Sequence, residues 1–148
     1  MANNILLSNQ HYNWETPKEL FDELNNEFYF TLDPCCTKEN AKCSIYYTIE
    51  DNGLNMNWGK HRVFMNPPYG RQISKWVEKA YSESLNGTLV VCLLPSRTDT
   101  KWWWDYCMKG EIRFIKGRLK FKGMNTQGEI VKNSSTFPSA IVIFNGVV

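Results

Sequence analysis

The sequence predicts one α/β domain whose sheet is mostly parallel, with an antiparallel edge. Short β-prone segments alternate with segments of helical periodicity, which is typical of α/β folds. Residues 88–94 are continuously apolar and rich in β-branched side chains, as expected of a strand buried on both faces. Residues 111–122 and 140–144 are predicted to be late strands without a helix between them, which favours antiparallel pairing. The 148 residues suit a single domain, 1–148.

The first predicted helix begins near Thr16. Thr16 and Glu19 fit a capping box, and Pro17 stands at the first helical position. The apolar residues that follow recur at the spacing of one helical face. Three short β-prone runs come next, and prolines stop the first and the third. These runs are residues 29–32, 44–49 and 62–65.

A second amphipathic helix is predicted after Gly70, ending at Asn86 and Gly87. Its apolar face consists of Ile73, Trp76, Val77, Ala80, Tyr81 and Ser84. Asp99 is a suitable cap for a third helix that runs to about Met108. Residues 123–138, which are rich in Gly, Asn, Ser and Thr, are expected to form a long loop.

The charge balance excludes a histone-like polycation, since 17 Lys and Arg oppose 15 Asp and Glu. Binding to nucleic acid would therefore need a local basic patch. A strand over 111–122 would place four cations on one face, which suits a phosphate backbone. The alternative is a solvated edge strand protected from aggregation. The four cations are Lys116, Arg118, Lys120 and Lys122.

Cysteine usage indicates a reducing compartment. The five cysteines are an odd number, and no basic, apolar leader precedes them. The adjacent pair Cys35 and Cys36 fits zinc-ligand spacing poorly, so we expect no metal site. The longest apolar run, 89–94, is too short to span a bilayer, and no membrane association is expected.

The strongest chemical signal is the tetrapeptide Asn66-Pro67-Pro68-Tyr69. It follows a predicted strand and precedes a helix, where α/β sheets bind ligands. The prolines donate no N–H and stiffen the segment. The Asn66 side chain and the Pro67 carbonyl offer acceptors, and Tyr69 offers a flat ring. This set suits a planar group with an exocyclic amine; the alternative is a tight turn between strand and helix.

Asn-Pro-Pro-Tyr is typical of amino-methyltransferases that use S-adenosylmethionine, and residues 14–144 resemble the phage-type DNA N6-adenine methyltransferases. Further matching segments are Trp14-x-Thr16-Pro17, Leu32-Asp33-Pro34, Glu39-Asn40-Ala41-Lys42, Trp58, Pro95-x-Arg97-Thr98 and Gly117-Arg118-x-x-Phe121. The resemblance implies a Rossmann-like methyltransferase core. It would be an abbreviated one, because the stretch from Asp33 to Asn66 is short and lacks a Gly-rich loop.

The resemblance implies methyl transfer from S-adenosylmethionine to N6 of an adenine flipped out of double-stranded DNA. The catalytic set would be Asn66, Pro67, Pro68 and Tyr69. Asn66 Oδ1 and the Pro67 carbonyl would accept the N6 hydrogens, and Tyr69 would stack on the base. A phage or prophage enzyme of this kind would work in the cytoplasm of a bacterial host.

The resemblance also implies a cofactor site. Thr16 and Pro17 match the cofactor motif of the family, which is compatible with a role as helix cap. Asp33 would attract the cofactor's ammonium, or would be an ordinary turn residue at the end of a strand. Glu39, Glu50 and Asp51 are the candidates for the ribose, with Asp51 preferred. The remaining assigned cofactor residues are Trp14, Pro34 and Cys35.

Arg97 and Thr98 follow the buried strand and are assigned to DNA. The predicted third helix contains three consecutive tryptophans, which cannot all lie on one apolar face of a helix. They are Trp102, Trp103 and Trp104. Either their helix is buried all round or one tryptophan faces a ligand or partner. No separate DNA-reading domain is evident, so the basic strand, the 123–138 loop and a second subunit in a homodimer are expected to help.

Two other interpretations remain open. The same cofactor and motif would serve an enzyme that methylates an RNA base, cytosine N4 or a protein glutamine. The second interpretation is a non-catalytic module that stacks nucleic-acid bases on its aromatic residues. The shortened cofactor loop supports it.

Overall fold

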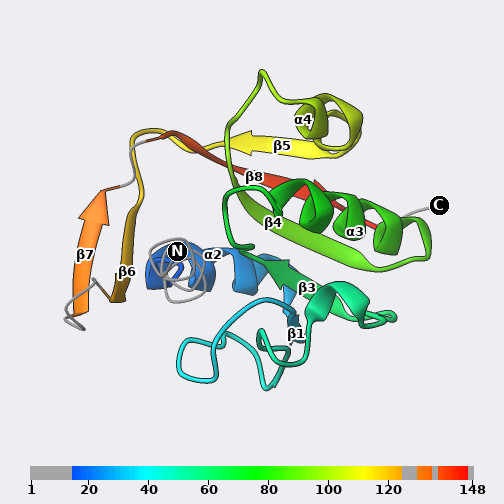
Figure 1. The fold of residues 1–148 in the computed structure, drawn as a ribbon, viewed down its shortest axis with the longest axis horizontal. Helices are drawn as coiled ribbons and strands as arrows, with labels where there is room; N and C mark the ends of the chain where they lie inside the picture. The colour runs from blue at the N-terminus through cyan, green and yellow to red at the C-terminus, as the bar shows by residue number, and fades with distance from the viewer. Residues whose placement is uncertain (1–14, 125–129, 135–136, 147–148) are drawn as a thin grey trace.

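The computed structural model describes residues 15–124, 130–134 and 137–146. They form a six-stranded sheet, in the order β2-β1-β3-β4-β8-β5, and a separate β6–β7 hairpin (Figure 1). The helices are α2 (Lys18–Phe28), α3 (Ile73–Leu85) and α4 (Lys101–Asp105), with short 3-10 turns η1 (Gly53–Asn55) and η2 (Cys107–Lys109). The strands are β1 (Leu32–Asp33), β2 (Ile45–Tyr46), β3 (Arg62–Met65), β4 (Leu89–Pro95), β5 (Glu111–Phe114), β6 (Lys120–Met124), β7 (Ile130–Ser134) and β8 (Ser139–Phe144).

The sheet confirms the predicted fold class. β1 pairs in parallel with β2 and β3, and β3 with β4, while β8 runs antiparallel between β4 and β5. The carboxyl ends of β1, β3 and β4 therefore lie at one edge, and the β6–β7 hairpin stands at that end of the molecule (Figure 1). No helix in the described ranges is long and apolar enough to cross a membrane.

The strand β4 is buried along its whole length, as predicted. Val90, Cys92 and Leu94 pack in one core with α3 and α4, whereas Val91 and Leu93 pack in a second core with α2. Successive side chains of a strand point to opposite faces, so an unbroken apolar run is what two covered faces require.

The predicted continuous strand over 111–122 is wrong. The chain leaves the sheet after β5, bends at residues 115–119, where Gly117 has φ 80°, and starts the new strand β6. A left-handed glycine ends the strand geometry that the alternating pattern suggested. The predicted loop 123–138 is also corrected, since β7 lies within it and pairs antiparallel with β6.

Two predicted helix caps differ from the structure. Pro17 is the cap residue of α2, and Thr16 makes no capping hydrogen bond there. Thr100 rather than Asp99 caps the third helix, because its Oγ1 accepts from the Trp103 N–H at 3.3 Å. The second helix agrees with its prediction: its buried residues include Ile73, and Asn86 is its C-cap.

The segment between β1 and β3 crosses the sheet without an α-helix, which accounts for its short length. Gly53 packs directly on the chain after β1: a Cβ there would lie 2.1 Å from the Pro34 carbonyl oxygen. Trp58 donates its indole N–H to the Gly53 carbonyl at 3.0 Å and stacks on Trp76 of α3. These contacts fix the turn that follows Asp33.

Gly53→Ala should lower the free energy of unfolding by about 2–3 kcal/mol, because backbone atoms have to move to admit the methyl group. Gly87→Ala is the matched control. Gly87 has φ 96°, and a Cβ there would meet nothing within 4 Å, so only backbone strain opposes that change. Its expected cost is about 1 kcal/mol. Equal costs in urea unfolding would contradict the close contact.

Candidate active site

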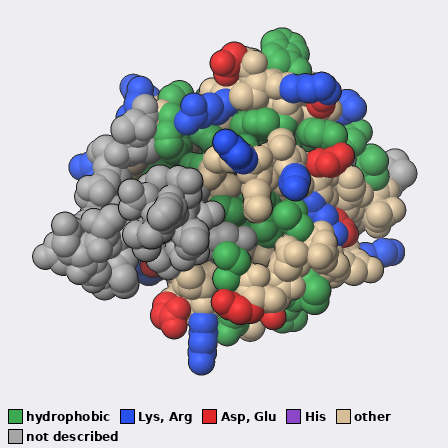
Figure 2. Space-filling view, in the orientation of Figure 1, with side chains coloured by type: hydrophobic (Ala, Val, Ile, Leu, Met, Phe, Trp, Pro, Cys, Tyr) green, Lys and Arg blue, Asp and Glu red, His purple; other side chains and the backbone are tan. Residues whose placement is uncertain are grey.

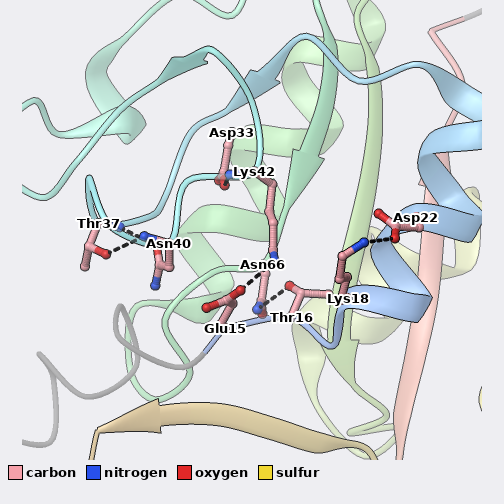
Figure 3. Close-up of polar contacts among 9 residues, drawn as sticks. All are labelled: Glu15, Thr16, Lys18, Asp22, Asp33, Thr37, Asn40, Lys42 and Asn66. Atoms are coloured by element: carbon pink, nitrogen blue, oxygen red, sulfur yellow. Dashed lines mark hydrogen bonds and ion pairs between the residues drawn. The ribbon is translucent and has the colours of Figure 1, made fainter. Parts of the chain in front are cut away.

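The predicted catalytic motif lies at the carboxyl edge of the sheet, beside the start of α2 (Figure 3). Asn66 follows β3 directly, and its Nδ2 donates to Thr16 Oγ1 at 3.0 Å. This bond joins residues 50 positions apart and fixes which way the amide points. With Nδ2 committed to Thr16, Oδ1 is the end of the amide that accepts hydrogen bonds. No pattern in the sequence indicates that Thr16 orients Asn66.

Tyr69 completes the motif. Its hydroxyl lies 3.3 Å from Asn66 Oδ1 and 3.4 Å from the Leu93 carbonyl oxygen, and it donates to both acceptors in a shared arrangement. Its ring meets Phe121 and Phe137 edge-on, with centroids 6.5 and 5.5 Å away. Burial raises the pKa of Tyr69, so the phenol stays neutral. The structure therefore brings the Asn66 side-chain amide and the Tyr69 ring together, and two phenylalanine rings contact the tyrosine.

Asp33 ends β1 as a buried carboxylate, 4% exposed. Its oxygens accept the backbone N–H groups of Lys42, at 3.0 Å, and Cys35, at 3.4 Å. The Lys42 ammonium pairs with Glu15 at 2.9 Å instead. Among the described residues no ion pair reaches Asp33, and burial raises the pKa of this carboxyl to about 6. A buried acid without a counter-ion is thus held at the edge of the sheet.

Pro34 and Cys35, which follow Asp33, are buried. Burial raises the pKa of the Cys35 thiol, so it stays protonated and is a poor metal ligand. Burial also raises the pKa of Cys43 to about 12. Within the described ranges, no group of three or more His, Cys, Asp or Glu side chains could hold a metal ion.

Of the three candidate ribose acids, Asp51 has the best defined surroundings. It lies in the loop after β2, and its carboxylate accepts from the Thr48 N–H at 2.9 Å and from Oγ1 at 3.2 Å. Glu50 also accepts from Thr48 Oγ1, at 3.1 Å. Because β1 and β2 are parallel neighbours, Asp33, at the end of β1, and the loop with Asp51, after β2, start from the same edge of the sheet. Glu39 is exposed in the turn between these strands.

The predicted DNA residues are divided between two places. Arg97 and Thr98 are exposed directly after β4, and the Arg97 guanidinium lies 5.5 Å from the centroid of Phe137. Lys116, Arg118 and Lys120 are exposed, but the bend after β5 separates the first two from β6, so they do not line one strand face. The Lys122 side chain and Trp14 lie outside the described residues.

Sequence reasoning missed the aromatic neighbours of Tyr69. Phe137 comes far later in the chain but reaches the Tyr69 ring because β8 returns beside β4. The order of the late strands predicts an antiparallel edge, but no local pattern indicates that Phe137 contacts Tyr69.

Asp33→Asn should change how stability depends on pH. The folded carboxyl, with a pKa of about 6, binds its proton more tightly than the usual value of 3.8 allows. The free energy of unfolding of the wild type should therefore fall by about 2 kcal/mol between pH 4 and pH 7, relative to the variant. Urea unfolding across this range checks it, with exposed Asp99→Asn as control. Parallel curves for wild type and Asp33→Asn would contradict the burial argument.

Comparison with known proteins identifies the family. Residues 4–147 match the DNA N-6-adenine-methyltransferase (Dam) family. The DNA N-6-adenine-methyltransferase of Escherichia phage T1 is 34% identical, over 80% of this chain and 60% of its own length. The YfdM protein of Escherichia coli (strain K12), which carries a provisional methyltransferase name, is 43% identical over 38% of this chain and 69% of its own length. The chain thus spans about 60% of its phage relative. It belongs to the DNA N-6-adenine-methyltransferase (Dam) family.

Proposed function

We propose that this protein transfers a methyl group from S-adenosylmethionine to N6 of adenine in double-stranded DNA. The observation that carries the proposal is the Thr16–Asn66 hydrogen bond, at 3.0 Å, which aims the amide oxygen of the Asn-Pro-Pro-Tyr motif. Family membership and the phage T1 relative, which is named a DNA N-6-adenine-methyltransferase, support it. The host cytoplasm, where phage and bacterial DNA are found, is the proposed compartment.

The chemistry of the sheet edge fits the cofactor. S-adenosylmethionine, when bound, supplies a methyl group activated by a sulfonium. Its ammonium would offset the charge of Asp33, which lacks a counter-ion among the described residues. The start of α2, with Thr16 and Pro17, suits its carboxylate. Pro34 and Cys35 would line the same side, and Asp51 would accept from the ribose.

The residues of the motif would act on the base. Asn66 Oδ1 and the Pro67 carbonyl would accept the two N6 hydrogens. Both acceptors would favour a pyramidal nitrogen with a localised lone pair. Both would also stabilise the positive charge that develops on N6 as the N–C bond forms and the methyl–sulfur bond breaks, until one N6 proton is lost to water. The hydrogen bond between the Tyr69 hydroxyl and Asn66 Oδ1, at 3.3 Å, is long and readily exchanged for one to the base. The ring of Tyr69 would stack on the adenine.

DNA would approach over the exposed residues around the carboxyl edge. Arg97 and Thr98 follow β4, Lys116 and Arg118 lie between β5 and β6, and Lys120 begins β6. Figure 2 shows Lys and Arg side chains over the upper part of one face, where Figure 1 draws α4 and the end of β4. Asp and Glu side chains lie at the lower edge of the same view, and some lie among the Lys and Arg side chains of the upper part. Since one small domain covers little of a duplex, we infer that two copies act together as a homodimer.

Asn66→Ala should reduce methyl transfer to duplex DNA by about 100-fold or more, because one of the two acceptors for the N6 hydrogens is lost. Its affinity for S-adenosylmethionine should stay within about threefold of wild type, since Asn66 faces the base. Labelled methyl transfer and calorimetry measure the two effects. Wild-type rates in Asn66→Ala would contradict the role of the amide.

The affinity for S-adenosylmethionine should rise between about pH 5 and pH 7.5, because Asp33, with a pKa of about 6, becomes charged in this range. Asp33→Asn should bind about tenfold more weakly at the upper end of the range and lose this pH dependence. Calorimetric titrations at several pH values provide the test. A pH profile that is unchanged by Asp33→Asn would assign the ammonium to another residue.

A further inference from the structure

The three consecutive tryptophans of α4 have different surroundings. Trp102 and Trp103 are buried, 9% and 2% exposed, and Trp103 stacks on Phe114 at 6.3 Å. Trp104 is 61% exposed. The core therefore accounts for two of the three indoles, and the third is a large aromatic surface in contact with solvent.

Trp104 is held in one orientation. Its indole N–H donates to the Thr98 carbonyl at 2.8 Å. The connecting turn is fixed as well, because Thr100 Oγ1 donates to the Arg97 carbonyl at 2.7 Å and accepts from the Trp103 N–H. Since the single N–H of the indole is used within the chain, the ring offers a partner its π-face rather than a hydrogen bond.

The turn that holds Trp104 is connected to the proposed active site. It follows β4, and Arg97 at its start lies over Phe137, whose ring contacts Tyr69 of the catalytic motif. Arg97 is exposed at the start of the turn, and Lys101, at its end, is exposed and paired with Asp105 at 2.5 Å. An exposed aromatic face, in a turn that begins at an exposed arginine and leads to the proposed base-binding site, suits stacking on a nucleic-acid base.

We propose that Trp104 stacks on a nucleobase that flanks the target adenine in the bound DNA. The inference rests on the proposed function, since it deepens the DNA interface of the same enzyme. The contact would be independent of sequence, because every base has a π-face. The indole is already fixed, so it would lose little conformational freedom on binding.

The test is the dissociation constant for duplex DNA, measured by fluorescence anisotropy. Trp104→Ala should bind at least about fivefold more weakly, the smaller end of the stacking range. Trp104→Phe keeps a ring but loses the bond to Thr98, and should stay within about twofold. Leu85→Ala is the matched control: Leu85 is a similarly exposed apolar residue, 56%, at the far end of α3. It should bind as the wild type does.

The dependence of DNA affinity on salt concentration distinguishes a stacking contact from a contact between charges. Trp104→Ala should leave the slope of affinity against salt unchanged, whereas Arg97→Ala should reduce it by about one. A reduced slope in Trp104→Ala would overturn the proposal. So would a Trp104→Phe variant as weak as Trp104→Ala, which would assign the effect to the turn.

Two further outcomes distinguish this inference from the proposed function. If the wild type methylates DNA and Trp104→Ala binds DNA equally well, only the stacking role fails. Light scattering on the same samples would show whether Trp104→Ala instead separates a dimer, which would make the exposed indole a protein contact and overturn the stacking role. If the wild type neither binds nor methylates DNA, both proposals fail.

Discussion

The site depends on the burial of β4 on both faces. Its side chains alternate between the core under α3 and the core under α2, so the strand is fixed against rotation and against slipping in register. The register continues into β3, where Met65 pairs with Cys92, and this places Asn66 next to Leu93. Tyr69 then reaches the Leu93 carbonyl from the turn that follows. The geometry of the Asn-Pro-Pro-Tyr motif is thus a consequence of how the middle of the sheet is packed.

The second requirement is that distant segments meet at the edge of the sheet. Thr16 arrives with the start of α2 and accepts a hydrogen bond from the Asn66 amide. Phe137 arrives with β8 and closes on the ring of Tyr69. Asp33 is held by backbone N–H groups from its own turn, whose position depends on Gly53. A small domain can therefore hold a buried acid, Asp33, and an aromatic cluster around Tyr69 at one edge of its sheet without a full set of crossover helices.

The parts of the fold that are determined by residues close together in the chain can be predicted from the sequence. Periodicity and proline chemistry decide the buried strand β4, the amphipathic face of α3 and the proline-stopped strand β3. The alternation over 111–122 continues through Gly117, and only the backbone shows the bend there. Thr16 has the right spacing from Glu19 for a cap, but its hydroxyl instead serves a residue 50 positions away. Contacts of that range leave no trace in one sequence.

The identity of the methylated nucleoside decides whether the site acts on adenine. Duplex DNA would be incubated with the wild-type protein and S-adenosylmethionine carrying a labelled methyl group, then digested to nucleosides and separated. The proposed acceptor role of the Asn66 amide, which Thr16 orients, together with membership of this family, predicts that the label is found in N6-methyldeoxyadenosine. Label in N4-methyldeoxycytidine, or in added RNA while the DNA stays unlabelled, would contradict the proposed reaction.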